Sequence, residues 1–107
     1  MKLGLYLLLL TAISLSVLTV SCNDNSEEVT FSNDVKSVYN KNCKGCHETG
    51  TNYAPIMASY AEIVDASKNK DLLGRIESTT NTMPPSGLMS DSEIQVFKDW
   101  ANGGYLE

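Results

Sequence analysis

The residues best suited to chemistry in this chain are Cys43, Cys46 and His47, which stand in the run Cys43-Lys44-Gly45-Cys46-His47. Two thiols separated by two residues lie about one helical turn apart, which suits addition to the two vinyl groups of one porphyrin. An imidazole directly after the second thiol can then reach the iron from the same side. The motif therefore predicts one covalently attached c-type haem.

Two other chemistries use similar residues. A structural zinc site needs four ligands, and the chain has three cysteines and a single histidine. A thioredoxin-like dithiol needs its C-x-x-C at a strand-to-helix junction, and the sequence shows no convincing strand. Haem attachment is the favoured interpretation, with zinc binding and dithiol chemistry as alternatives.

Residues 1–21 are predicted to be an export signal and not part of the fold. Lys2 is the only charged residue among them, residues 3–20 are largely apolar, and Ser21 supplies a small residue at the exit. A basic start followed by an apolar stretch and a small residue is typical of a secretory signal. Covalent haem attachment in bacteria is completed outside the cytoplasm, so the signal and the haem motif support each other.

Cys22 follows this leader directly, and the preceding residues resemble a bacterial lipobox, although Leu18 stands one position further from the cysteine than usual. Lipidation of Cys22 is favoured because it gives every cysteine in the chain a role. An uncleaved membrane anchor is one alternative, since the apolar run approaches the length that spans a bilayer. A soluble export signal with a stray thiol is another.

The rest of the chain reads as a short polar tether, residues 22–30, and one small domain, residues 31–107. All thirteen acidic residues lie in this part, and the net charge of the full chain is −5. A basic patch for nucleic acid is therefore not expected. A domain of this size often needs a covalent or metal staple, so a buried haem would contribute to the core as well as to function.

Apolar periodicity and capping residues predict three or four helices and no strand. Two pairs, Ser59 with Glu62 and Ser90 with Glu93, have the spacing of capping boxes. Gly103 stands where a glycine ends a helix. The expected helices run from Ser32 or Asn33 to Asn42, from Ser59 to a break at residues 68–70, over residues 71–77, and over residues 91–102. Residues 48–55 and 78–87 are expected to be loops.

The whole domain resembles a small class I c-type cytochrome. The similarity lies in the helix before Cys43, the C-x-x-C-H motif, Tyr60 and Ile63, residues 72–76, the run Met83-Pro84-Pro85, and the closing residues 100–104. The resemblance implies an all-α fold around one haem, with the first and last helices packed together near it. It also implies electron transfer as the activity.

His47 is the only histidine, so a second histidine ligand within the chain is impossible. The far side of the iron must take a methionine, a weaker ligand such as Lys or Asn, or nothing. Met57 follows His47 too closely to wrap around a porphyrin, and Met89 stands at the start of the last helix. Met83 lies on a loop that Pro84 and Pro85 stiffen, so Met83 is the expected sixth ligand of the iron. The other two methionines are expected to fill the core, with Met89 as the fallback ligand.

Two residues are candidates for supporting the haem. The resemblance implies that the carbonyl of Pro55 accepts the free N–H of His47, although Pro55 is equally an ordinary loop proline. Arg75, the sole arginine, has the planar fork that suits a haem propionate, with a solvated helix charge as the alternative. Trp100, Phe97 and Tyr60 are expected to be core residues.

The sequence thus predicts an exported, lipid-anchored, mono-haem electron carrier on the periplasmic side of a bacterial membrane, with redox proteins as partners. No catalytic constellation indicates an enzyme. Lys36, Lys41 and Lys44 predict a basic rim beside the haem for docking.

The first alternative function is a haem-based sensor or binding module for small ligands, with an open sixth position. The second is a module that uses its two thiols without haem.

Overall fold

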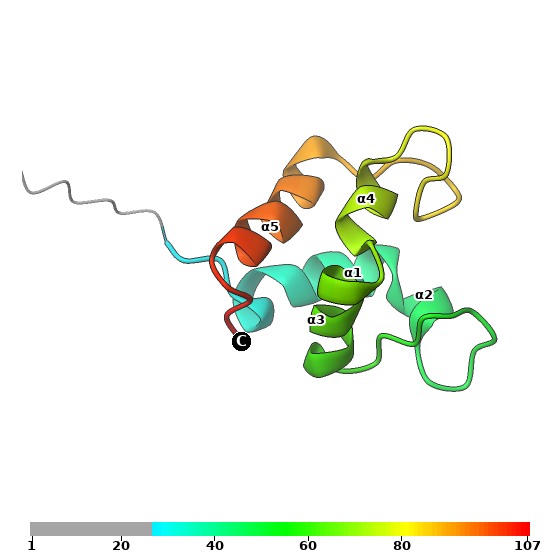
Figure 1. Cartoon of the computed structure of the whole chain (residues 1–107), viewed down its shortest axis with the longest axis horizontal. Helices are drawn as coiled ribbons and strands as arrows, with labels where there is room; N and C mark the ends of the chain where they lie inside the picture. Colours follow the sequence, from blue (N-terminus) through cyan, green and yellow to red (C-terminus); the bar gives the residue numbers. More distant parts are fainter. Residues whose placement is uncertain (1–26) are drawn as a thin grey trace, which may run out of the picture.

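The computed structural model describes residues 27–107. The predicted export signal and Cys22 lie outside this part of the chain. Within it every regular element is a helix, which confirms the all-α prediction (Figure 1). No helix between residues 27 and 107 is long and apolar enough to cross a lipid bilayer.

The first helical segment comprises two consecutive elements. It begins as a π-helical turn, η1 (Phe31–Val35), and continues as α1 (Lys36–Asn42). Thr30 caps the segment, because its hydroxyl oxygen accepts the backbone N–H of Asn33 at 3.3 Å. The predicted start at Ser32 or Asn33 is therefore wrong by one or two residues, since the cap is a threonine that precedes the polar run.

A short helix, α2 (Lys44–His47), follows after a break at Cys43. The break is visible in the backbone of Cys43, which has φ −123° and ψ −40°. The amide of Cys43 still bonds to the carbonyl of Tyr39 at 2.8 Å, so α2 continues directly from α1 with a change of direction. The sequence pattern did not predict this separate turn.

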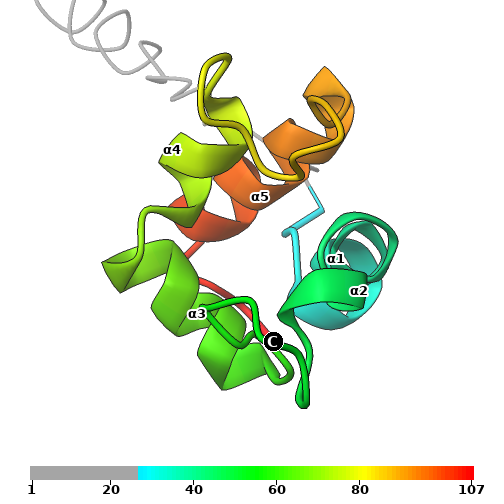
Figure 2. The ribbon, with the colours of Figure 1, turned by 90° about the vertical axis from the view of Figure 1, so that its right-hand side faces the viewer.

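The remaining helices are α3 (Tyr60–Asn69), α4 (Leu72–Glu77) and α5 (Asp91–Asn102). The three predicted helices correspond to these elements within one or two residues. Their connections matter for the site: two residues separate α3 from α4, whereas a long loop joins α4 to α5. In Figure 2, α2 lies on one side of the domain and α3 and α4 lie on the other.

The two predicted capping boxes differ in the structure. Ser90 and Glu93 form the full reciprocal pair at the start of α5. At α3 the hydroxyl of Ser59 accepts the N–H of Glu62, but the Glu62 carboxylate accepts from that same hydroxyl and completes no reciprocal bond to the Ser59 backbone. At α3, therefore, only one of the two hydrogen bonds of a capping box is present.

Aromatic side chains in and around the core connect the first helical segment with α5 and the C-terminal tail. Trp100 and Phe97, on α5, are almost fully buried. The ring of Trp100 lies 6.0 Å from that of Phe31, 6.2 Å from that of Tyr60 and 4.9 Å from that of Tyr105, between centroids. The pairs of Trp100 with Tyr60 and with Tyr105 are edge-to-face, and such pairs add to the free energy of area burial. Trp100 and Phe97 are core residues, as predicted, whereas Tyr60 is partly buried and packs against the core.

The C-terminal tail closes this aromatic cluster. The carbonyl of Leu106 accepts the indole N–H of Trp100 at 2.7 Å and the backbone N–H of Phe31 at 2.8 Å. The turn into the tail uses Gly104 at φ 87°, whereas Gly103, which the sequence marks as the helix terminator, keeps φ −77°. Gly103 is the C-cap of α5, as predicted, and the left-handed residue Gly104 follows it.

Candidate haem-binding site

One cavity gathers most of the residues that the sequence singles out. It contains about 730 Å³ of empty space, part of it open to solvent. Its walls come from α2, the loop after α2, the α3–α4 region and the loop before α5. The lining residues are Asn42, Cys43, Cys46, His47, Ala54, Pro55, Met57, Ala66, Lys70, Leu72, Arg75, Ile76, Met83, Pro84 and Pro85.

The two thiols differ in environment although α2 holds both at the cavity. Cys43 is half-buried, and burial raises the pKa of its thiol to about 11. Cys46 is exposed, and both thiols are free. A side chain at Gly45 would meet nothing within 4 Å, so the backbone between the thiols borders open space.

The imidazole of His47 is fixed by a bond to the backbone. Its Nδ1 lies 2.8 Å from the carbonyl oxygen of Pro55. Because a carbonyl only accepts, Nδ1 carries the proton in this contact and Nε2 keeps its lone pair. The loop that supplies Pro55 is held by two further contacts, from the Thr51 hydroxyl to the Cys46 carbonyl at 2.6 Å and from the Met57 amide to the His47 carbonyl at 2.7 Å. The histidine is thus oriented as a metal-ligating histidine usually is.

Two methionines line the cavity, and they come from different sides. Met57 is bonded through its backbone to His47, so its chain segment lies on the histidine side. Met83 belongs to the loop between α4 and α5, and its amide donates to the carbonyl of Arg75 at 3.0 Å. Met89 is buried in the core and is not among the lining residues. Only Met83 therefore combines a place in the cavity with a chain segment remote from His47.

Arg75 leaves a donor without a partner. Its Nε is buried and makes no hydrogen bond within residues 27–107, and the side chain lines the cavity. An unpaired buried guanidinium N–H is costly unless an acceptor reaches it. A carboxylate on the ligand would supply that acceptor, and haem carries two propionates. The residues present therefore fit a haem in this cavity.

The charge of the cavity wall also suits an anionic ligand. Lys70 and Arg75 are the only charged residues that line it, and no acidic residue does. In the predicted basic rim of Lys36, Lys41 and Lys44, the charge of Lys41 is already paired, because its ammonium forms a 2.7 Å ion pair with Glu93. Lys70 also has a partner, Asp65, at 2.7 Å. Of the two cationic residues that line the cavity, Lys70 is paired with Asp65, whereas Arg75 forms no ion pair within residues 27–107. The Arg75 guanidinium could therefore bind an anionic group of a ligand.

Part of the wall was not predicted from the sequence. Leu72 and Ile76 lie in the range 72–76 that resembles the cytochromes but were given no role at the haem, and Ala66, Asn42 and Lys70 were not singled out. The helical spacing of Leu72 and Ile76, four residues apart on α4, is the signal that places them on one face. Nothing local marks Asn42 or Lys70, because their position at the cavity depends on how α1 and α3 pack.

The family comparison agrees with this geometry. Residues 32–100, more than half of the chain, match the family described as cytochrome C oxidase, cbb3-type, subunit III. Comparisons with curated proteins and with solved structures give no significant match. The matched range contains the attachment motif, the cavity wall and all but the end of α5. The chain therefore belongs to this family of cytochrome c domains.

Proposed function

We propose that this protein is an exported mono-haem electron carrier in which Cys43 and Cys46 hold haem c and His47 and Met83 are the axial ligands. The observation that carries the proposal is that all four side chains line one cavity. Membership of a cytochrome c family supports haem-based electron transfer as the activity. When bound, the haem exchanges single electrons between its ferric and ferrous states.

Each protein residue has a distinct part in this proposal. The Pro55 carbonyl orients His47 and raises the basicity of the free Nε2 by accepting the Nδ1 proton. Met83 supplies a neutral, soft thioether that favours ferrous iron. Arg75 donates to a propionate and offsets its charge inside a cavity with apolar walls. The protein thereby sets the potential at which an electron enters and leaves.

The location follows from the first residues of the chain. Residues 1–21 act as a lipoprotein-type signal, Cys22 bears the lipid, and residues 22–30 tether the domain to the periplasmic side of a bacterial membrane. The motive is the basic, apolar and small-residue order that ends at a cysteine. The partners are redox proteins that give and take one electron at the haem.

The direct test is the absorption spectrum of the purified full chain together with haem detection after denaturing electrophoresis. Haem that stays with the denatured chain and a thioether–iron band in the oxidised protein are the expected results. A five-coordinate spectrum would favour the open-site sensor instead. A protein without covalent haem would contradict the proposal altogether.

A further inference from the structure

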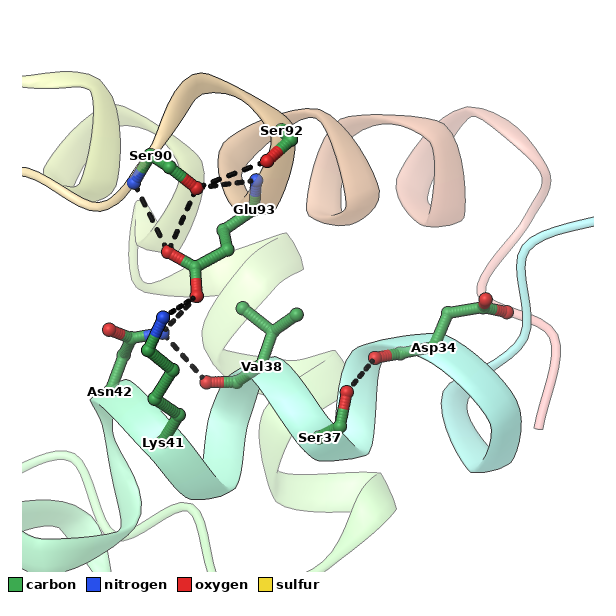
Figure 3. Close-up of polar contacts among 8 residues, drawn as sticks. All are labelled: Asp34, Ser37, Val38, Lys41, Asn42, Ser90, Ser92 and Glu93. Atoms are coloured by element: carbon green, nitrogen blue, oxygen red, sulfur yellow. Dashed lines mark hydrogen bonds and ion pairs between the residues drawn. The ribbon is translucent and has the colours of Figure 1, made fainter.

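The carboxylate of Glu93 lies between α1 and α5 and makes contacts to both (Figure 3). Its Oε1 accepts from the Lys41 ammonium at 2.7 Å and from the Asn42 side-chain amide at 3.4 Å. Both donors belong to the last turn of α1. Asn42 is also tied to its own helix, because the same amide group donates to the Val38 carbonyl at 3.0 Å.

The second carboxylate oxygen serves the start of α5. Oε2 accepts from the backbone N–H of Ser90 at 3.1 Å and from the Ser90 hydroxyl at 3.1 Å. The two oxygens thus divide their partners between two segments that are far apart in sequence. A carboxylate can do this because it accepts on both sides, whereas an amide has only one accepting oxygen.

Glu93 joins two segments that each contribute residues to the wall of the haem cavity. One is α1, and the other is the loop that carries Met83. Asn42 lines the cavity and directly precedes Cys43. Ser90 is the residue at which the loop that carries Met83 ends and α5 begins. Within that loop the backbone is held by the bond from Met83 to the Arg75 carbonyl and by one from Gly87 to the Pro84 carbonyl at 3.2 Å. The hydrogen bonds of Ser90 to Glu93 hold the C-terminal end of this loop.

We infer that Glu93 is a positioning residue of the haem site, which holds the Met83 loop at a fixed spacing from the helix that delivers Cys43. The inference deepens the proposed function and rests on Met83 being the sixth ligand. Glu93 touches neither the ligand cavity nor the predicted iron ligands, so its effect is exerted through Ser90 and Asn42.

The protonation state of Glu93 is consistent with this role. The Lys41 ammonium, followed by the Ser90 backbone N–H, lowers the pKa of the Glu93 carboxyl to about 2. The group is therefore a carboxylate at any pH near neutrality. The Lys41 side chain is 70% exposed, so the ion pair by itself contributes little to global stability. The effect that the test below measures is therefore the spacing of the two segments.

The test compares carbon monoxide binding to the ferrous full-length protein in the wild type, in four variants, and in Met83→Ala as the reference for a fully open sixth position. Glu93→Gln leaves one accepting oxygen for two sets of donors. Lys41→Met removes the shorter of the two contacts with α1 and leaves the cap of α5 intact. Lys41→Arg keeps the charge and serves as the rescue. Glu77→Gln is the matched control, because it breaks the 2.9 Å pair of Glu77 with Lys98, also on α5, without touching Ser90.

We expect Glu93→Gln and Lys41→Met to bind carbon monoxide about two- to fivefold faster than the wild type, because the loop releases Met83 more often. The thioether–iron band should weaken in the same two variants. Lys41→Arg and Glu77→Gln should behave as the wild type does. If Glu93→Gln loses helix content, Lys41→Met alone decides the question, since its change lies on an exposed side chain.

Two failures are distinguishable. If the wild type shows the thioether–iron band and both variants bind carbon monoxide at the wild-type rate, Glu93 has no positioning role and the proposed ligation stands. If the wild type already binds carbon monoxide as fast as Met83→Ala does, the proposed ligation fails and the positioning role fails with it.

Discussion

The backbone amide of Met83 donates a 3.0 Å hydrogen bond to the carbonyl oxygen of Arg75. This bond ties the loop of the proposed iron ligand to α4, whose Arg75 side chain lines the same cavity and has a buried Nε with no hydrogen-bond partner among residues 27–107. Met83 and Arg75 thus both line the cavity, from two pieces of backbone that this hydrogen bond joins. The arrangement leads to the following expectations.

Removal of the Arg75 charge should lower the reduction potential. In Arg75→Gln, a propionate loses its cationic partner. Ferric iron carries one more positive charge than ferrous iron, so removal of a nearby cation stabilises the ferric state and lowers the potential. At an effective dielectric constant near 20, the loss corresponds to about 40 mV, or about 1 kcal/mol for one electron. Redox titration of the variant measures the shift, with Lys98→Gln as a control because Lys98 pairs with Glu77 away from the cavity. An unchanged potential in Arg75→Gln would remove Arg75 from the haem site.

Loss of the Tyr60 hydroxyl should destabilise the domain without changing the haem. The hydroxyl donates to the carbonyl of Tyr105 and fixes the C-terminal tail on the aromatic cluster. Tyr60→Phe leaves that carbonyl without its partner and should lower the free energy of unfolding by about 1 kcal/mol. Denaturant titration measures it. Tyr53→Phe is the control, because Tyr53 is 64% exposed and makes no such bond. Equal stabilities of the two variants would show that the tail contact contributes nothing.

The acid side of the stability curve should depend on Glu93. The pKa of its carboxyl is about 2 in the folded state against an ordinary 4.5, so its contribution is fully present above pH 4.5. That contribution is lost as the pH falls from 4.5 through about 2. Glu93→Gln should therefore remove part of the fall in unfolding free energy within this window and leave the slope near neutrality unchanged. Denaturant titrations at several acidic pH values test this, and parallel curves for the two proteins would contradict it.

The proposed lipid anchor has a simple test in cells. Cys22→Ser removes the thiol that would carry the lipid, so the variant should move from the membrane fraction to the soluble periplasmic fraction with its haem intact. Haem staining of the two fractions reads out the location. A variant that stays with the membrane like the wild type would show that residues 1–21 are an uncleaved anchor.

Much of the fold could be predicted because the signals are local. The α5 boundaries follow from Ser90, Glu93 and an apolar face, and a cap and its partner lie within one turn. The start of the first helix was misplaced because Ser32 and Asn33 look like caps, whereas the observed cap is Thr30. The end of α5 at Gly103 was predicted correctly, because a glycine directly after the last apolar turn is itself a local signal.

The cavity wall shows where sequence patterns stop being sufficient. The motif Cys43, Cys46 and His47 names the attachment point because its chemistry is set by spacing alone. The ion pair of Lys41 with Glu93 spans 52 positions, so no local pattern places those two residues together. Lys41 was consequently assigned to a docking rim, although in the structure its charge is paired within the domain.

The central claim is that Met83 binds the iron opposite His47, and one comparison tests it most directly. The oxidised spectra of Met83→Ala, Met57→Leu and Met89→Leu should be recorded beside that of the wild type. The thioether–iron band should vanish in Met83→Ala alone, because Met57 is bonded to the His47 segment and Met89 is buried outside the cavity. Loss of the band in Met57→Leu or Met89→Leu, or its survival in Met83→Ala, would contradict the account.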